Sequence, residues 1–488
     1  MQFWKLHKTP LLLAVTSILF YFSFAYDLVR TDYIKLLGLY TGLFFLFYKL
    51  IQITKHDLKL LTWIAFTFRA VFILATPNLS QDFYRFIWDG QMLSLGMNPY
   101  LSTPENIMNM GFLTGFPNQK ELYDGMGSLS ASHYTNYPPL NQILFFWANL
   151  FPGRSILSSV IGLRLIIIAA DFGTLYFGKK LLEKLKLPTH NIFWYILNPF
   201  IIIELTGNLH FEGVMIFFLV WSLYLLYSGK WKLAAVMFAC SVSIKLIPLL
   251  FLPLFWQWFS KRKVIAREQN DEKSHNQIEN NEILKQVQHD EKWIPAFAGM
   301  TKLIGFYTIV GVVTALSFLP FYSSEFIDNY SQTVGLWFKN FEFNASLYYV
   351  AREVGYMFRG YNEIAIIGKY TAIMVFLFVV GMAFLRKNKS IVQLITAMLF
   401  ALSFYYFTAT TVHPWYVATL LILSVFTKYK FPLVWSFVII LSYLAYLQIG
   451  QADKSENLWI IAIEYTIVYG FLIWELFTKK QPLFFKRF

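Results

Sequence analysis

Apolar residues occur along this chain in long continuous runs, separated by shorter polar and basic links. A run of about 18 or more apolar residues is long enough to cross the hydrocarbon core of a bilayer as a helix. The runs are continuous rather than alternating, and alternation is the pattern typical of a membrane β-barrel. The pattern therefore predicts an all-α, polytopic membrane protein.

The apolar runs predict about 13–14 transmembrane or re-entrant helices. They cover residues 10–26, 33–53, 60–77, 156–177, 191–206, 214–227, 231–259, 303–321, 364–385, 391–411, 415–426, 431–447 and 458–477. The run at 140–151 is too short to span comfortably, so we expect it at the interface. The run at 231–259 has basic residues at both ends, so we expect a re-entrant pair broken at 243–248, where Pro248 interrupts a helix.

Composition agrees with a membrane protein, since 57% of the 488 residues are hydrophobic, 20% are aromatic and only 14% are charged. The net charge of +13 comes from Lys and Arg clusters between the apolar runs, which is where the positive-inside rule places them. The charge therefore indicates topology and not nucleic-acid binding. The single cysteine, Cys240, lies in an apolar run, so no disulfide framework exists.

Residues 1–488 are expected to form one transmembrane domain with two distinct segments. The basic start of the chain and the basic link at 55–59 are assigned to the cytoplasm, which puts the polar segment 78–139 on the other side as the first large non-cytoplasmic loop. Residues 264–302 are polar and nearly free of apolar periodicity, so they predict a disordered cytoplasmic insertion. No metal-ligand spacing accompanies its histidines.

The first loop begins with charged residues at helical spacing. Asp82, Arg85 and Asp89 are separated by three, four and seven residues, so on a helix they share one face. Asp82 is a candidate general base, or it complements the positive end of the helix dipole. Arg85 is a candidate partner of either carboxylate, and Asp89 before Gly90 either contributes to the site or ends the helix in a turn.

The predicted topology brings five polar stretches to the non-cytoplasmic face. They are residues 82–100, 134–139, 208–212, 322–344 and 411–416. Charges between helices are costly and often functional. The candidate substrate-binding residues are Arg85, Trp88, Asp89, Asn98, Tyr100, Tyr137, Asn208, His210, Glu212, Lys245, His413, Trp415 and Tyr416.

For several of these candidates the sequence leaves a structural role open. Lys245 lies in an apolar run, where it either binds a phosphate or extends to the membrane surface. His210 and His413 are single histidines with either a structural or an acid–base role. The aromatic rings of 415–416 either belong to an interfacial belt or stack on a sugar.

Seven short motifs follow one another along the chain: DFYRFIWDG at 82–90, NPY at 98–100, YPPL at 137–140, NP at 198–199, GNLHFE at 207–212, SIKLIP at 243–248 and HPWY at 413–416. In this order, the motifs resemble those of GT-C class glycosyltransferases, and in particular the bacterial polyprenyl-phosphate-mannose-dependent mannosyltransferases. Together these motifs extend over most of the chain. Gln81 departs from the pattern, because related enzymes often have two adjacent acids there, and this leaves a divalent metal requirement open.

The resemblance implies an inverting glycosyltransferase of the bacterial inner membrane, with its active site on the non-cytoplasmic face. Asp82 would act as general base in moving a sugar, with mannose favoured, from a polyprenyl-phosphate donor to a hydroxyl of a lipid-linked or glycan acceptor. The partners implied are membrane lipids, the polyprenyl-phosphate sugar and the acceptor, without nucleic acid. A lipid-linked saccharide flippase or transporter and a glycan polymerase or ligase remain alternatives.

Overall fold

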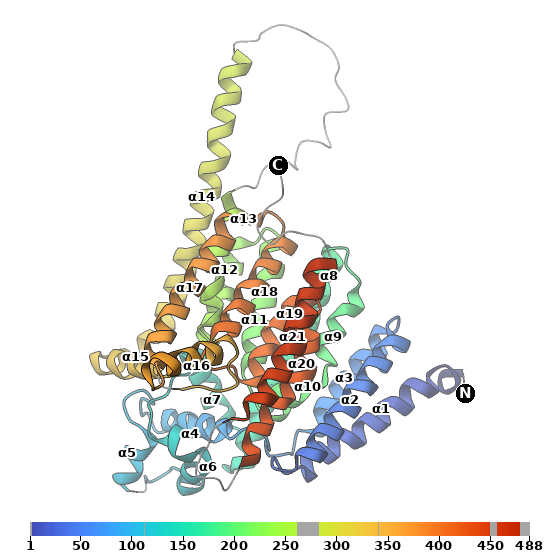
Figure 1. The fold of residues 1–488 in the computed structure, drawn as a ribbon, viewed down its shortest axis with the longest axis vertical. Helices are drawn as coiled ribbons and strands as arrows, with labels where there is room; N and C mark the ends of the chain where they lie inside the picture. The colour runs from blue at the N-terminus through green and yellow to red at the C-terminus, as the bar shows by residue number, and fades with distance from the viewer. Residues whose placement is uncertain (1, 112, 261–282, 340, 449–455, 479–488) are drawn as a thin grey trace.

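The computed structural model describes residues 2–111, 113–260, 283–339, 341–448 and 456–478. Within these ranges the regular secondary structure is helical. The β-type backbone pairing in them is an isolated bridge between Phe343 and Thr411. The all-α prediction is confirmed. Long helices run side by side as a bundle, and shorter helices gather at one of its ends (Figure 1).

Seven helices in the described part of the chain are long and apolar enough to cross a membrane. These stretches are His7–Asp27 in α1 (Gln2–Asp27), α2 (Tyr33–Thr54), α8 (Ile156–Lys184), Gly299–Phe321 of α14 (Ile283–Phe318) with η4 (Leu319–Phe321), α17 (Ile364–Phe384), α18 (Ile391–Thr408) and α21 (Leu458–Thr478). A pair of helices bent by 115° adds an eighth candidate span. The polytopic membrane prediction is confirmed.

The remaining apolar runs form shorter helices, so this count is lower than the predicted 13–14. They form α3 (Leu58–Val71), α9 (Phe193–Ile196), α10 (Pro199–Ile201), η2 (Ile202–Gly207), α11 (Glu212–Tyr227), α12 (Trp231–Ile244), η3 (Ile247–Phe255), α13 (Trp256–Ser260), η5 (Pro414–Tyr416), α19 (Val417–Val425), α20 (Phe431–Val438) and η6 (Ile439–Gln448). Pro199, Pro248, Pro414 and Pro432 each stand in the first turn of a helix. Proline has no N–H for the preceding turn, so it begins a helix where a span would otherwise continue.

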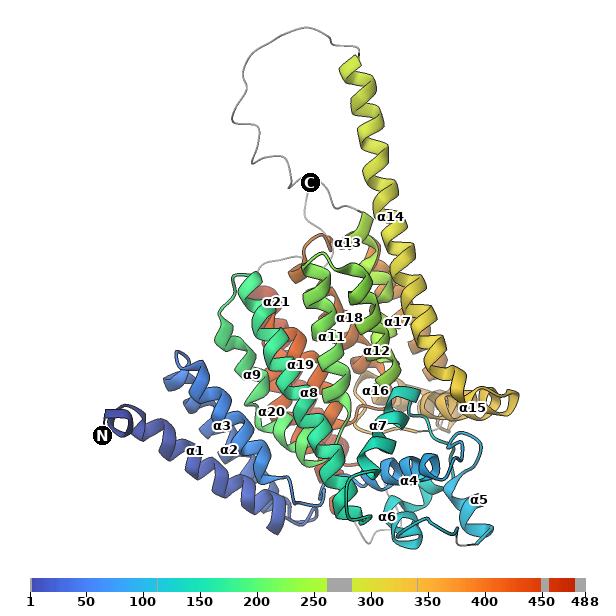
Figure 2. The same cartoon turned by 180° about the vertical axis from the view of Figure 1, so that it is seen from behind.

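Residues 78–139 fold into a layer of short helices at one end of the bundle. The layer contains α4 (Asp82–Ser94), α5 (Pro104–Asn109) and α6 (Gln119–Ala131). The apolar run at 140–151, which we expected at the interface, forms α7 (Pro139–Asn149), and this helix is too short to span the membrane. Figure 2 shows α4, α5 and α6 below the ends of α8 and α11, at the end opposite to the projecting part of α14.

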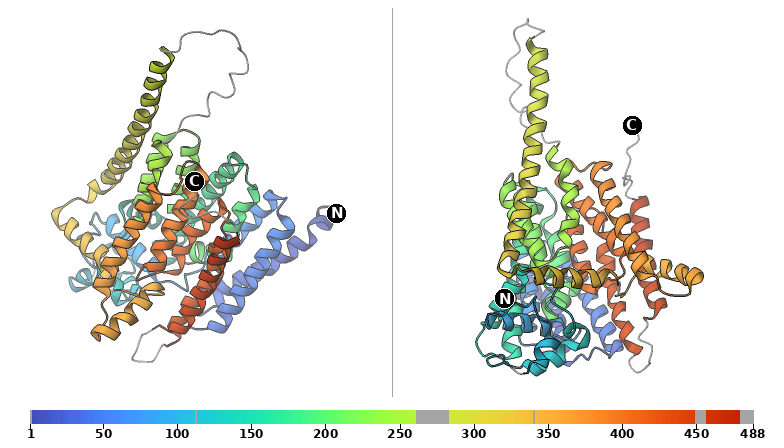
Figure 3. Two further views of the ribbon diagram at one scale, coloured as in Figure 1. Left: turned by 45° about the horizontal axis from the view of Figure 1, so that its top comes forward. Right: turned by 90° about the vertical axis from the view of Figure 1, so that its left-hand side faces the viewer.

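Two more helices lie across the bundle rather than along it. They are α15 (Ser324–Lys339) and α16 (Leu347–Arg359), and both cross the direction of the long helices (Figure 3). The segment 322–344 was expected as a polar stretch, and most of it is helical. Its helix α15 lies close to the first loop, since Asn329 Nδ2 donates to Tyr100 O at 3.1 Å.

The predicted break in the run 231–259 is present. The α-helix α12 ends at Ile244, and Lys245 has an extended backbone with φ −147° and ψ 139°. The chain then continues as the 3₁₀ helix η3, which has Pro248 in its first turn. The side chain of Lys245 is thereby placed at a helix end instead of in the middle of a span.

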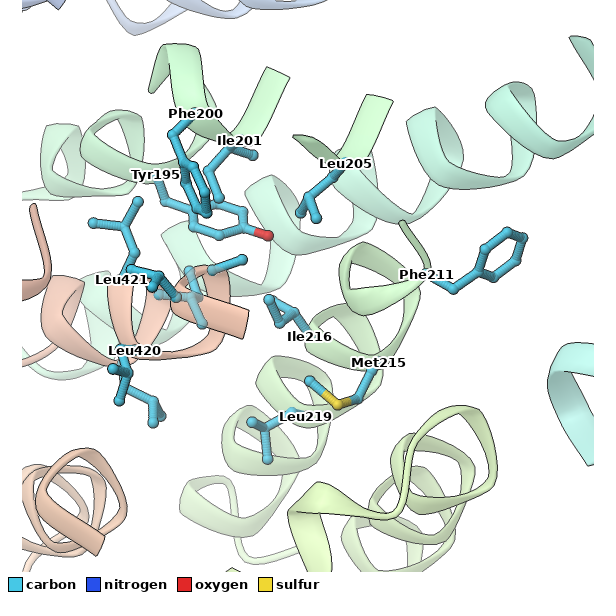
Figure 4. Close-up of a cluster of buried hydrophobic side chains, with 14 of the residues drawn as sticks. Tyr195, Phe200, Ile201, Leu205, Phe211, Met215, Ile216, Leu219, Leu420 and Leu421 are labelled. Atoms are coloured by element: carbon cyan, nitrogen blue, oxygen red, sulfur yellow. The ribbon is translucent and has the colours of Figure 1, made fainter. Parts of the chain in front are cut away.

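A densely packed core supports the other bend, between η2 and α11. Figure 4 shows Tyr195, Phe200 and Ile201 beside Leu420 and Leu421, with Ile216 and Leu219 of α11 below them. All of these side chains are almost completely buried. The apolar contacts hold α11 against α19 and fix the direction in which α11 begins.

The predicted disordered insertion is only partly described. Residues 264–282 lie outside the described residues, and residues 283–302 form the first part of α14. This helical part differs from the prediction. The sequence there includes three Lys, two Gln, one Leu and one Glu, which have high helix propensity even where no apolar stripe is evident.

Candidate active site

A cavity of about 600 Å³ lies between the α4–α6 layer and the ends of the bundle helices. Its lining includes Asp82, Arg85, Tyr137, Glu212, Lys245, Thr333, Phe341, His413, Trp415 and Tyr416. Each of the five polar stretches expected to converge contributes at least one of these residues. The structure therefore brings the stretches together around one cavity.

Asp82 is the first residue of α4 and is half-buried at the cavity wall. A carboxylate in the first turn of a helix is stabilised by the helix dipole. The position of Asp82 is therefore also compatible with this structural role. Its carboxylate forms no hydrogen bond or ion pair with another residue in the described ranges. The group is thus accessible from the cavity.

The electrostatic surroundings of Asp82 favour a basic carboxylate. Burial raises the pKa of Asp82 to about 6, while the charge of Lys245 opposes the rise, the charge of Glu212 adds to it, and Arg30 also opposes it. A pKa near 6 leaves most of the carboxylate ionised at neutral pH and makes it a stronger proton acceptor than an ordinary aspartate.

Arg85 pairs with Asp89 and not with Asp82. Its Nε donates to Asp89 Oδ1 at 2.7 Å, and its Nη1 donates to the carbonyl oxygens of Ser130 (2.7 Å) and His133 (2.9 Å). Gln142 Nε2 donates to the other oxygen of Asp89 at 3.1 Å. These buried bonds join α4 to the end of α6 and to α7, which fixes the direction in which α4 presents Asp82.

The interpretation that Asp89 and Gly90 end the helix is wrong, because α4 continues to Ser94. Gly90 instead permits a close helix contact. A Cβ atom at Gly90 would lie 2.5 Å from the carbonyl oxygen of Phe145 in α7 and 2.2 Å from Asn149 Nδ2. The absence of a side chain lets the backbones of α4 and α7 approach one another.

Lys245 forms an ion pair with Glu212 at the cavity wall. The Lys245 Nζ also lies 5.5 Å from the centroid of the Tyr416 ring. The Lys245 side chain is 23% exposed and lines the cavity, so it does not extend to the membrane surface. Asn141 Nδ2 donates to the carbonyl oxygen of Ile244 at 2.7 Å, which holds the end of α12 next to the cavity.

The residues at 413–416 form an aromatic wall of the cavity. The ring of Trp415 is stacked between His210 (centroid distance 3.5 Å) and His413 (4.6 Å). The Trp415 ring is thus occupied by two imidazoles, which fits neither the interfacial belt nor the stacking on a sugar that the sequence left open. Burial lowers the pKa of His413 to about 3, and the charge of Lys245 lowers it further, so this imidazole is neutral at neutral pH.

A short backbone bridge holds this wall in place. Phe343 N–H donates to Thr410 O at 3.0 Å, and Val412 N–H donates to Phe343 O at 2.8 Å. The ring of Phe343 stacks on His413 with a centroid distance of 5.2 Å. The segment after α15 and the segment after α18 thus position each other, although about 70 residues separate them.

Six predicted substrate-binding residues lie outside the cavity lining: Trp88, Asp89, Asn98, Tyr100, Asn208 and His210. Their contacts are those of a supporting framework. Tyr100 donates its hydroxyl to Tyr137 O at 2.6 Å, and Asn98 Nδ2 donates to Phe321 O at 3.1 Å. Asn208 Oδ1 accepts the N–H of Leu79 at 3.2 Å. The polar motifs therefore contain residues of two kinds, those at the cavity and those that hold its walls.

Several polar residues were not predicted from the sequence as part of the site. Gln81, noted only as a departure from the motif, lines the cavity next to Asp82, whereas Asn141 and Gln142 hold Ile244 and Asp89 from behind. The signal for Asn141 and Gln142 was present, since these adjacent amides follow Leu140 near the start of an otherwise apolar helix. Among the described residues, no three His, Cys, Asp or Glu side chains lie close enough to hold a metal ion.

Comparison with known proteins places this site in a family context. Residues 20–260 match the family described as "Alpha-(1->6)-mannopyranosyltransferase, N-terminal domain". The chain is 23% identical over 191 residues to alpha-(1->6)-mannopyranosyltransferase A of Mycobacterium tuberculosis (strain ATCC 25618 / H37Rv), a match that covers 39% of this chain and 35% of that protein. It thus spans about a third of the length of this curated relative. The matches confirm the resemblance to mannosyltransferases, and residues 20–260, which contain Asp82, Arg85, Glu212 and Lys245, are similar to the alpha-(1->6)-mannopyranosyltransferase N-terminal domain.

Proposed function

We propose that this protein is a membrane mannosyltransferase that uses Asp82 as general base. It transfers mannose from a polyprenyl-phosphate donor to a hydroxyl of a lipid-linked or glycan acceptor, with inversion at the anomeric carbon. The observation that carries the proposal is the position of the Asp82 carboxylate, which has no partner among the described residues and faces the same cavity as the Lys245 ammonium. A base and a cation at one cavity match the two charges that the reaction must handle.

The reaction moves one proton and exchanges one bond. Asp82 accepts the proton of the acceptor hydroxyl, and the hydroxyl oxygen forms a bond to the anomeric carbon of the sugar. The bond between that carbon and the phosphate oxygen breaks, and its electron pair leaves with polyprenyl phosphate. Because the leaving group is a phosphate, no strong acid is needed, and correct positioning of donor and acceptor provides much of the rate.

Lys245 is the candidate partner of the donor phosphate. A lysine binds phosphate as a point charge, and the charge developing on the leaving group strengthens that attraction in the transition state. Glu212 holds the ammonium at the cavity before the donor enters. The neutral imidazole of His413 adds a hydrogen-bonding group to the cavity without adding charge.

The cavity also has an apolar side suited to the lipid part of the donor. It is lined there by Ile247 and Leu250 of η3 and by Ala372 and Val375 of α17. The helix α17 is a candidate membrane span with most of its surface exposed, so this side adjoins the region of the bilayer. A polyprenyl chain would reach the cavity from the membrane between these helices.

The position of the charges favours an enzyme over a transporter. Transporter sites lie near the bilayer midplane between repeated halves. Asp82 and Arg85 instead belong to the short-helix layer at one end of the bundle, and α8 ends at Lys184, at the opposite end (Figures 1 and 2). With the positive-inside rule, this arrangement supports a non-cytoplasmic position of the site in a bacterial inner membrane.

The test is transfer of labelled mannose from polyprenyl-phosphate mannose to a lipid-glycan acceptor by purified protein. We expect transfer with the wild type, a loss of at least about a hundredfold with Asp82→Asn, and normal transfer with Asp328→Asn, a matched change at an exposed carboxylate of α15. Retained activity in Asp82→Asn would remove the base assignment. Failure with mannose, glucose and arabinose donors alike would favour the transport alternative, and a polymeric product would favour a polymerase or ligase.

A further inference from the structure

A second hollow, of about 820 Å³, lies on the other side of the contact between α4 and α6. Tyr84 of α4, Phe116, and Glu121, Asp124 and Gly125 of α6 contribute to its lining. None of these residues belongs to the cavity described above. The hollow is open to solvent, and its lining combines aromatic rings with two carboxylates and the ammonium group of Lys120.

The Tyr84 ring is seated on the backbone of Gly125. A Cβ atom at Gly125 would lie 2.6 Å from two atoms of this ring, so a side chain there would push the ring out of place. The ring is half-buried, and its hydroxyl has no hydrogen-bond partner in the described part of the chain. The Phe83 ring also packs against it, with the centroids 4.0 Å apart. Tyr84 therefore offers the hollow the uncovered part of its ring and a free polar group.

The carboxylates of Glu121 and Asp124 are exposed beside this ring. Three residues apart on α6, they share one helix face, and neither forms an ion pair with another described residue. The nearby amide of Gln119 is already occupied, since its Oε1 accepts the N–H of Leu113 at 2.8 Å and its Nε2 donates to Gly111 O at 3.3 Å. Gln119 fixes the wall, while the carboxylates remain available as hydrogen-bond acceptors.

The hollow and the cavity share a wall. Gln81 and Met126 line the cavity, and Gln81 Nε2 donates to Met126 O at 3.1 Å. Tyr84 and Gly125, their near neighbours on the same two helices, line the hollow. Tyr84 follows Asp82 by two residues, or about 3 Å of helix rise. A chain molecule that ends at Asp82 could pass over the exposed Gln81 side chain to reach Tyr84.

We propose that this hollow binds the sugar units of an oligosaccharide acceptor that lie behind the unit receiving the new sugar. This assignment rests on the function proposed above and specifies its acceptor as a neutral oligosaccharide. A pyranose presents a C–H face that packs on an aromatic ring and hydroxyls that donate to carboxylates. Glu121 and Asp124 outnumber the single cation of the lining, Lys120, so the hollow disfavours an anionic ligand.

The kinetic test compares alkyl mannosides carrying one and four α-(1→6)-linked mannose units as acceptors. We expect the wild type to have a lower KM for the tetrasaccharide. Tyr84→Ala is expected to raise that KM by about tenfold, which corresponds to one aromatic contact, and to leave the KM of the monosaccharide unchanged. Tyr84→Phe retains the ring and is expected to preserve most of the difference, whereas Gly125→Ala displaces the ring and is expected to remove it.

A binding measurement separates this inference from the proposed reaction. Saturation-transfer NMR with the tetramannoside is recorded on the Asp82→Asn protein in nanodiscs, where no turnover is required. We expect a signal that is lost on adding Tyr84→Ala. Binding without transfer in the wild type would contradict the proposed reaction and leave the glycan site in place. Equal binding with and without the Tyr84 ring, or no binding of mannose, glucose or galactose tetramers, would overturn the inference.

Discussion

Lys245 is held at the cavity wall by Glu212, the first residue of α11, across a break in one helix and a bend in another. Both side chains face the cavity that also contains Asp82. The ion pair holds the Lys245 ammonium in the same cavity as the Asp82 carboxylate, where it can exchange Glu212 for the phosphate of an entering donor. The pair therefore combines a structural and a functional role, and mutations can separate the two.

Lys245→Met leaves the buried Glu212 carboxylate without its cation. We expect the free energy of unfolding to fall by up to about 3 kcal/mol and mannosyl transfer to fall about a hundredfold. The double variant Lys245→Met with Glu212→Gln removes the unpaired charge, so we expect stability to recover while activity does not. Thermal unfolding in detergent and initial rates measure the two effects.

The exposed Lys230, at the start of α12, provides the matched control as Lys230→Met. This variant is expected to match the wild type in both measurements. If activity returned together with stability in the double variant, Lys245 would be a structural residue and the phosphate role would be wrong.

The pKa of Asp82 predicts an acidic limb in the pH–rate profile. Burial raises that pKa to about 6, so below pH 6 the carboxylate is protonated and can no longer accept a proton. We expect kcat/KM to fall about tenfold per pH unit below 6 and to level off above pH 7. The residual rate of Asp82→Asn is expected to show no such limb, and a limb of the same shape in that variant would assign it to another group.

The same shift makes a prediction about stability. A carboxyl group whose pKa is raised by folding favours the folded state while it is protonated and loses that contribution as the pH rises through about 6. Replacing Asp82 by Asn removes an ionised group that is partly desolvated. We therefore expect the Tm of Asp82→Asn at pH 7.5 to be at or above that of the wild type, although its activity is lost.

Much of the fold could be predicted from local sequence features. The long apolar runs that became α2, α8, α17 and α21 were recognisable because span length is a property of one segment. The break at Lys245 was recognisable for the same reason, since Pro248 follows within three residues. The way in which the proline-interrupted runs divide into short helices was less predictable, because the arrangement of short helices depends on packing between segments.

The site was predictable as a group of motifs, but the role of each residue was not. Asp82 and Asp89 share a helix face, and the sequence alone makes both carboxylates candidates for the site. In the structure, Asp82 faces the cavity and Asp89 is completely buried against Arg85. The difference arises from the contact with α7, which lies some 50 residues further along the chain, and spacing within α4 contains no information on it.

Asp89→Ala is expected to act on stability and not on substrate binding. It would leave the buried Arg85 guanidinium without its carboxylate partner, and removing one partner of a buried ion pair costs about 3–5 kcal/mol. We expect a lower Tm, with an unchanged KM for the donor in the protein that remains folded. Asp328→Asn again serves as the control. A large rise in the donor KM without a change in Tm would restore the substrate-contact interpretation for Asp89.

Gly90→Ala tests whether the close approach of α4 and α7 positions the base. The added Cβ would meet the backbone carbonyl of Phe145 at 2.5 Å, and neither helix can move without shifting Asp82 or Gln142. We expect a loss of about 1–3 kcal/mol in the free energy of unfolding and a lower kcat, since overpacking of this kind displaces backbone. Gly38→Ala in α2, where no atom lies within 4 Å of the added carbon, is the matched control and is expected to be neutral or slightly stabilising. Wild-type kcat in Gly90→Ala, measured at a temperature where the protein is fully folded, would show that the base tolerates movement of α4.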